Sequence, residues 1–231
     1  MFEIVAIIVC VNILILLKIF LNINIKELKK LKIRESEELE VLSNKFPEDE
    51  RICKDILKKL NNNIEVNIKK DEEYSSCLYM VFNNTIILGK FKQKYMKLQT
   101  IAHECIHSNQ DKILLWGNFI YSNIYLAYYV LIILLEIFNK LLYSQIHITN
   151  LILSGLVQYV LRNTLENEAM TKAKYVAEEY MDENKFLDKN EEKMLLDEYD
   201  RVNKIGIPFM NYYLITNNII KVIIFSVIVL I

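Results

Sequence analysis

Long apolar segments constrain this chain more than any other feature of its sequence. Four mostly apolar runs, residues 1–21, 113–135, 148–161 and 212–231, alternate with charged segments. Because an α-helix rises about 1.5 Å per residue, about 20 apolar residues cross a hydrocarbon core of about 30 Å. The run 148–161 is shorter and reaches that length only if flanking residues from Leu141 onward contribute. The sequence therefore predicts a mainly α, multi-pass membrane protein with about four transmembrane helices.

Basic residues predict the orientation of these helices. A basic cluster follows the first run directly: Lys26, Lys29, Lys30, Lys32 and Arg34. By the positive-inside rule this flank is cytoplasmic and the N-terminus lies outside. A cleaved signal peptide is the competing interpretation of the first run, but a basic start and a small-x-small cleavage site are both missing. We expect an uncleaved anchor in a cell membrane. The amino-acid composition of the chain is typical of an AT-rich bacterial genome.

The apolar runs divide the chain into five parts. Residues 1–21 form a transmembrane helix, and residues 22–112 form a cytoplasmic part with helices and a small sheet. Residues 113–162 form a transmembrane hairpin, residues 163–211 a second cytoplasmic helical segment, and residues 212–231 the last transmembrane helix. Burial of the hairpin inside a soluble enzyme is the alternative, which is disfavoured because the remaining sequence is too short to cover such long apolar runs.

Charge and cysteine content argue against a nucleic-acid-binding protein and against a disulfide-rich protein. The formal net charge is −1, so no basic field for a nucleic-acid partner is expected. The four cysteines, Cys10, Cys53, Cys77 and Cys105, have no CxxC spacing. We therefore expect reduced thiols rather than a disulfide framework or a cysteine metal site.

The first cytoplasmic part shows two helical patterns and three short strands. Residues 25–45 are expected to form one charged helix, and Pro47 to open a second helix, residues 48–60. Residues 64–68 alternate apolar and polar side chains, as a half-buried strand does. Residues 77–82 and 85–88 flank Asn83-Asn84, which predicts a hairpin with a two-residue turn and hence a small antiparallel sheet. An exposed strand of such a sheet could bind an extended peptide.

A five-residue motif carries the chemistry. His103-Glu104-Cys105-Ile106-His107 has the pattern HExxH within a predicted helix, residues 93–112. Residues four apart share one helix face, so His103 and His107 can bind one metal ion while Glu104 serves as a general base. This spacing is typical of zinc peptidases. Cys105 is expected to point away from the metal.

A catalytic zinc site needs a third protein ligand. His147, the remaining histidine, lies at the hairpin tip, a membrane thickness away. The hairpin returns the chain to the side it left, so Glu166 or its neighbour Glu168 is expected beside the motif, with Glu166 preferred. Ala169 is small enough to let their helix approach the HExxH helix closely.

These features resemble integral-membrane zinc metallopeptidases of the HtpX and CAAX prenyl protease type, a zincin-like fold with an HExxH…ExxA signature. The resemblance rests on the HECIH core, the hairpin and Glu166-Asn167-Glu168-Ala169 in the same order. It implies Zn²⁺ bound by His103, His107 and Glu166, with Glu104 as the catalytic base. Met170 stands where the family usually has an acidic residue.

The sequence therefore predicts a membrane-embedded zinc metalloendopeptidase with its site on the cytoplasmic side. Its expected substrates are peptides or membrane-associated proteins. Arg162, Asn163 and several tyrosines are candidates for stabilising the oxyanion. The alternatives are a non-catalytic scaffold and a sensor-type membrane protein that keeps a metallopeptidase-like site. A site-2-type intramembrane protease fits poorly, because no later aspartate lies within an apolar run to supply the third ligand.

Overall fold

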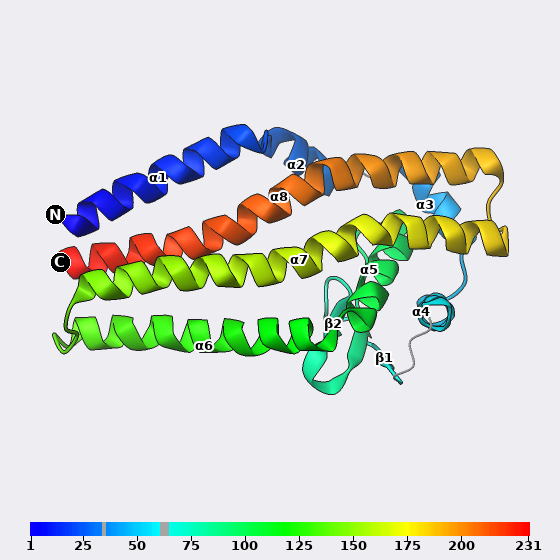
Figure 1. The fold of residues 1–231 in the computed structure, drawn as a ribbon. Helices are drawn as coiled ribbons and strands as arrows, with labels where there is room; N and C mark the ends of the chain where they lie inside the picture. Colours follow the sequence, from blue (N-terminus) through cyan, green and yellow to red (C-terminus); the bar gives the residue numbers. More distant parts are fainter. Residues whose placement is uncertain (34–35, 61–64) are drawn as a thin grey trace. The chain divides into compact units, whose positions relative to one another are not determined.

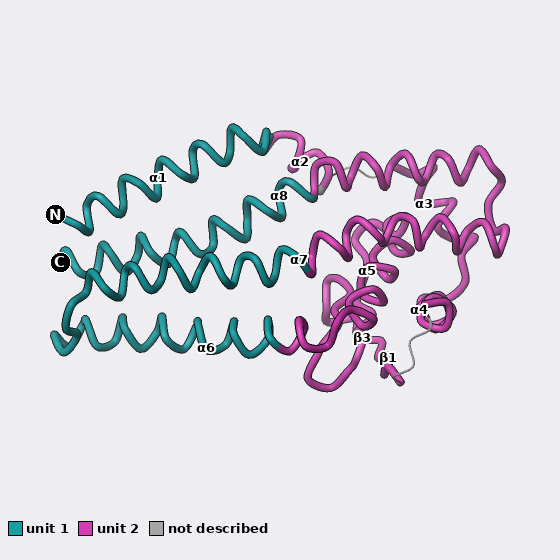
Figure 2. The backbone as a smooth tube through the Cα atoms, viewed as in Figure 1, with its two compact units in different colours: residues 1–24, 117–164, 207–231 teal, residues 25–116, 165–206 magenta. Residues whose placement is uncertain are grey.

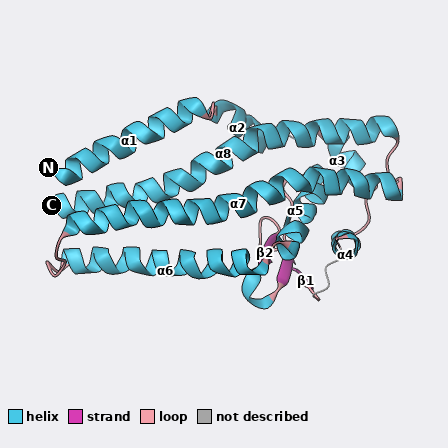
Figure 3. Cartoon of the chain, in the orientation of Figure 1, coloured by secondary structure: helices cyan, strands magenta, loops and turns pink. Residues whose placement is uncertain are grey.

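The computed structural model describes residues 1–33, 36–60 and 65–231, and these residues are mostly helical (Figures 1 and 3). In chain order the helices and strands are α1 Phe2–Phe20, α2 Ile25–Ile33, α3 Glu37–Ser43, α4 Asp49–Lys59, β1 Asn67–Lys70, β2 Leu78–Met80, β3 Thr85–Leu88, α5 Lys97–Asn109, α6 Lys112–Ile137, α7 Ser144–Asn184 and α8 Lys189–Leu230. Two 3₁₀ turns, η1 Val81–Asn83 and η2 Lys94–Met96, precede β3 and α5. The mainly helical class that the sequence predicts is confirmed.

The chain forms two compact units, which Figure 2 distinguishes by colour. The first, the apolar unit, comprises residues 1–24, 117–164 and 207–231. The second, the site unit, comprises residues 25–116 and 165–206. Helices α6, α7 and α8 each contribute residues to both units.

Three helices, α1, α6 and α8, are long and apolar enough to cross a membrane. Their outward side chains are strongly apolar, as shown by Leu16 of α1, which is 65% exposed, and Ile124 of α6, which is 63% exposed. The fourth expected span, residues 148–161, is helical as part of α7. Polar side chains such as Asn150 and Gln158 make this segment less apolar than the other three, so among the described residues three such helices are found rather than four.

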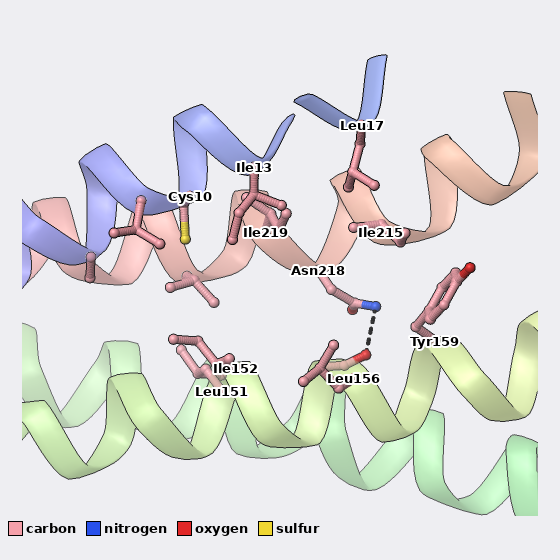
Figure 4. A pocket seen from close by; sticks show the side chains of 14 residues that line it. Cys10, Ile13, Leu17, Leu151, Ile152, Leu156, Tyr159, Ile215, Asn218 and Ile219 are labelled. Atoms are coloured by element: carbon pink, nitrogen blue, oxygen red, sulfur yellow. Dashed lines mark hydrogen bonds between the residues drawn. The ribbon is translucent and has the colours of Figure 1, made fainter. Parts of the chain in front are cut away.

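The apolar unit has polar groups inside it. The amide of Asn218 on α8 donates to the carbonyl of Gly155 at 3.1 Å and to Oε1 of Gln158 at 2.8 Å, both on α7. Asn218 also lies in the wall of an apolar cavity of about 360 Å³ lined by residues of α1, α7 and α8 (Figure 4). Because helices surrounded by lipid must satisfy their polar groups internally, a polar interior beneath an apolar surface is the arrangement expected of membrane helices.

The site unit is built on a conventional buried core. Ile52 and Ile56, one turn apart on α4, are fully buried, as are Ile101 and Ala102 on α5. The thiols of Cys53 and Cys105 pack between these helices with their sulfur atoms 3.6 Å apart. All four cysteines are free, as predicted. This core fixes the orientation of α5.

The three strands form a mixed sheet in the order β1-β3-β2. Strand β2 pairs antiparallel with β3, as predicted, but β1 runs parallel to β3, with Ile68 opposite Ile86. The prediction of an all-antiparallel sheet was therefore wrong in this strand. The β2–β3 turn is also longer than the predicted two residues, since η1 precedes Asn84, which adopts the expected positive φ of 48°. Ile64, the predicted start of the first strand, lies outside the described residues.

Two short helices replace the single helix predicted for residues 25–45. Helix α2 ends at Ile33, and α3 begins after Ser36, whose hydroxyl accepts a hydrogen bond from the N–H of Leu39 at 3.4 Å. Ser36 thus acts as the N-cap of α3. A serine at this position can indicate the start of a new helix, but the continuous run of charged residues around it resembles one uninterrupted helix. Arg34, counted in the basic flank, lies outside the described residues.

Candidate metal centre

Helix α5 carries the motif and is shorter than the sequence indicates. It begins at Lys97 rather than at residue 93, and it ends at Asn109 because Gln110 takes an extended backbone conformation with ψ of 165°. Asp111 then starts α6 by accepting a hydrogen bond from the N–H of Leu114 at 2.9 Å. The motif is therefore held on a short, separate helix, whose buried side packs on the core of the site unit.

The two histidines and Glu166 converge as predicted. The Nε2 atoms of His103 and His107 lie 3.0 Å apart. Oε2 of Glu166 lies 3.6 Å from Nε2 of His103 and 3.7 Å from Nε2 of His107. In a tetrahedral site with metal–ligand bonds of about 2.0–2.1 Å, ligand atoms are separated by roughly 3.3 Å. The three observed separations bracket this value, so the group could hold a metal ion.

Glu166 reaches the histidines because α7 packs on the same core. Leu165 is 3% exposed, and the alanines at positions 169, 173 and 177, each four residues apart, are fully buried. Such a small-residue stripe permits close packing of a helix. The expectation that Ala169 lies at a packed face is confirmed, and α7 continues without a break through Ser144–Asn184.

The charges of the cluster reinforce one another. Burial alone would raise the pKa of Glu166, but the neighbouring imidazoles of His103 and His107 lower it well below its usual value. Burial alone would lower the pKa of His107, but Glu166 and Glu104 raise it overall. The carboxylate is therefore ionised at neutral pH, which is the form a metal ligand requires.

Glu104 lies on the same helix but in a different environment. Its side chain is 8% exposed, and its Oε2 accepts a hydrogen bond from the backbone N–H of Tyr79 on β2 at 2.7 Å. Burial raises the pKa of Glu104, although both histidines and the Tyr79 N–H act in the opposite direction. A carboxylate with a raised pKa, held beside a metal-binding group, suits proton transfer near neutral pH.

Glu168, the alternative ligand, does not join the cluster. Its carboxylate accepts hydrogen bonds from Nζ of Lys172 at 2.5 Å and from Nε2 of Gln110 at 2.9 Å. Between the two carboxylates that the sequence left open, the geometry thus favours Glu166. Gln110 is a residue that sequence reasoning missed; the available signal was a glutamine three residues after His107, within reach of that side chain on a helix.

The other residues considered from the sequence lie elsewhere. His147 belongs to the apolar unit, where its Nδ1 is 2.9 Å from the hydroxyl of Tyr128. Arg162 and Asn163 also belong to that unit. Met170 belongs to the site unit, and its carbonyl accepts a hydrogen bond from Asn203 at 3.4 Å. Cys105 packs against Cys53, as expected of a residue that points away from the histidines.

Comparison with known proteins gave no relative. No family model, curated protein or solved structure matches this chain. The donor set itself indicates which metals suit the site. Two imidazole nitrogens and one carboxylate oxygen form a set that zinc takes in hydrolases, with one position left for water.

Proposed function

We propose that this protein is a membrane-embedded zinc metalloendopeptidase. The observation that carries the proposal is the convergence of two motif histidines and a glutamate from a distant helix, at separations that suit tetrahedral zinc. His103, His107 and Glu166 would hold the metal. When bound there, zinc would lower the pKa of a water molecule and polarise a substrate carbonyl.

Glu104 is the residue placed to move protons. It adjoins His103 in the chain, is held by Tyr79, and has a raised pKa because it is buried. In the proposed reaction its carboxylate takes a proton from the attacking water and passes it to the nitrogen of the leaving amine. The hydrogen bond from Tyr79 leaves its other oxygen, Oε1, available for this transfer.

The sheet supports a peptide as the substrate. Strand β2 lies at the edge of the sheet, and the Tyr79 N–H points away from β3 to bond with the motif helix. An extended peptide that adds to this edge would pass in front of Glu104. A main-chain carbonyl would then be presented to the proposed metal centre.

The surface of the apolar unit supports a membrane location. Its helices have apolar outer faces and polar contacts inside, and three of them are long enough to span a bilayer. With the basic flank after α1 on the cytoplasmic side, the site unit is also cytoplasmic. Membrane proteins and membrane-associated peptides are the proposed substrates.

The test measures metal content and cleavage in the same preparations. The full chain is purified in detergent, depleted of metal with a chelator and titrated with Zn²⁺, and cleavage of an unstructured reporter protein is followed. We expect one zinc per chain, cleavage that depends on zinc, and loss of both in His103→Ala. A matched control, His147→Ala, should keep both, because His147 belongs to the apolar unit.

The same test separates the alternative function. A protein that binds one zinc through His103 but cleaves no reporter, with or without membranes, would favour the non-catalytic or sensor-type role. A protein that binds no zinc would contradict the proposed enzyme and favour the non-catalytic scaffold, which does not need a metal.

A further inference from the structure

Gln110, the residue directly after the motif helix, contacts a histidine of the motif through its side chain. Gln110 leaves the helical conformation, and its side chain is 6% exposed. Its Oε1 lies 2.7 Å from Nδ1 of His107, the ring nitrogen on the other side from the cluster. Burying a primary amide at a helix end is costly unless each of its groups has a partner.

The partners of Gln110 determine which way its amide faces. Its Nε2 lies 2.8 Å from the carbonyl oxygen of Leu165 and 2.9 Å from Oε2 of Glu168. The carbonyl oxygen of Leu165 can only accept hydrogen bonds, and the Glu168 carboxylate is an acceptor because its other oxygen is ion-paired with Nζ of Lys172. The two N–H groups of Gln110 must therefore face Leu165 and Glu168, and the carbonyl Oε1 must face His107.

The orientation of Gln110 in turn determines the tautomer of His107. Oε1 can only accept, so Nδ1 of His107 must carry the hydrogen. In the neutral ring the lone pair is then on Nε2, the atom that lies 3.0 Å from Nε2 of His103. The ring is thus oriented with its metal-binding nitrogen toward the cluster.

We propose that Gln110 is a positioning residue that, anchored by Glu168 and Leu165, fixes His107 in the orientation and tautomer that bind metal. The inference rests on the proposed function, because it assigns Gln110 a role toward the same metal centre. Metal-bound histidines generally donate their other N–H to a carboxylate, carbonyl or water, and loss of such partners weakens metal binding about 10–100-fold. Here the partner is the amide of the residue directly after the motif helix, and Glu168 supplies the negative charge behind it.

The position of Gln110 explains two features of the sequence. Met170, where the resembled family has an acidic residue, offers no strong acceptor for a histidine N–H. Glu168 lies two residues earlier on α7 and makes contact through Gln110 instead. The break between α5 and α6 falls at Gln110, whose side chain there contacts both His107 and residues of α7.

The experiment measures the affinity of the full-length protein for Zn²⁺ by competition with a chromophoric chelator. Gln110→Met keeps the length of the side chain but removes the acceptor, and we expect zinc binding about 10–100-fold weaker. The control is Asn109→Ala, the neighbouring residue, whose side chain donates to the carbonyl of Leu60. This control should bind zinc as the unmodified protein does.

A rescue variant separates positioning from general stability. In the double variant Gln110→Glu with Glu168→Gln, one carboxylate oxygen at position 110 accepts from Nδ1 of His107 and the other accepts from the amide at position 168, while the carbonyl of Leu165 loses the donor that Gln110 supplies. We expect it to bind zinc more tightly than Gln110→Met does, because the outer hydrogen bond to His107 is restored. Equal affinity in Gln110→Met and the unmodified protein would overturn the inference, and so would a rescue variant as weak as Gln110→Met.

A spectroscopic measurement covers the case in which Gln110→Met does not fold. In the zinc-loaded, ¹⁵N-histidine-labelled protein, we expect His107 to keep a proton on Nδ1 and to bind through Nε2. Binding through Nδ1 would contradict the inference. Failure of the unmodified protein to bind zinc would instead contradict the proposed function, so the two failures are distinguishable.

Discussion

The backbone N–H of Tyr79 donates to Oε2 of Glu104 at 2.7 Å, so the edge strand β2 and the motif helix α5 are joined at the side chain proposed as the base. The bond holds Glu104 in one orientation without using a second titratable group. The same N–H belongs to the strand edge to which a peptide would add. In the proposed function, substrate binding at this edge would therefore be coupled to the position of the base through Tyr79.

Replacing Glu104 by Gln should separate metal binding from turnover. The amide oxygen of Gln can still accept the Tyr79 N–H, so we expect the variant to fold and to bind one zinc per chain. It cannot take a proton from water, and removal of a general base typically costs about 10²–10⁴-fold in rate. Reporter cleavage and zinc content measured side by side check this, and a Glu104→Gln protein with unreduced cleavage would contradict the mechanism.

Replacing Glu166 and Glu168 one at a time should identify the third ligand. Glu166 faces both histidine Nε2 atoms, whereas Glu168 faces Gln110 and Lys172. We expect Glu166→Gln to weaken zinc binding by more than the about 100-fold typical of losing an outer partner. Glu168→Gln keeps an acceptor for Gln110 and should change affinity by only a few-fold. Chelator competition measures both, and the reverse order of effects would assign the ligand role to Glu168.

The convergence of Glu166 with the two motif histidines could be predicted because it follows from helix geometry and chain direction. Residues four apart on a helix share one face, and a hairpin returns the chain to the side it left, so the sequence predicts Glu166 near His103. The break at Gln110 was missed because neither glycine nor proline marks it. Asp111, which caps α6, was the available signal.

Partner choice between distant segments could not be predicted in the same way. The alternation around Ile68 indicates a strand, but it does not predict that the strand runs parallel to β3. Alternation shows which side chains share a face of the sheet, and it carries no information about the direction of the neighbouring strand. The role of Gln110 likewise depends on Glu168, which is 58 residues away in the chain. Such contacts depend on how α5 and α7 pack, which local patterns do not specify.

The metal-free protein should show a pH window in which Glu166 stabilises the fold. The pKa of Glu166 is lower in the folded protein than in the unfolded chain, so ionised Glu166 stabilises the fold above about pH 4.5. This stability is lost as the pH falls through the pKa of the folded protein. The pKa of His107 is higher in the folded protein than in the unfolded chain, so protonated His107 stabilises the fold below about pH 6.5. This stability is lost as the pH rises through the pKa of the folded protein. Both contributions are fully present only between these two values.

We therefore expect the difference in melting temperature between the unmodified protein and Glu166→Gln, both metal-free, to be largest between about pH 4.5 and 6.5. It should shrink toward pH 3 and toward pH 9. Thermal unfolding in detergent with a chelator present measures it. Lys172→Ala is the control, because its exposed ion pair with Glu168 should contribute at most about 1 kcal/mol. A difference that does not change across this range would contradict the ionic contact between Glu166 and His107.

Two helical glycines in the apolar unit provide a matched test of its packing. A Cβ added at Gly155 on α7 would lie 3.1 Å from Cβ of Asn218 and 3.1 Å from the hydroxyl of Tyr125, whereas a Cβ at Gly117 on α6 would have no neighbour within 4 Å. Gly155→Ala must push α8 or Tyr125 away, and overpacking of this kind costs about 1–3 kcal/mol. Gly117→Ala adds only helix propensity and should be neutral or stabilising by up to about 1 kcal/mol. Thermal unfolding of the two variants in the same detergent compares them directly. Equal melting temperatures would mean that α7 and α8 do not pack closely at Gly155, because the intrinsic gain from replacing a helical glycine by alanine is similar at both positions.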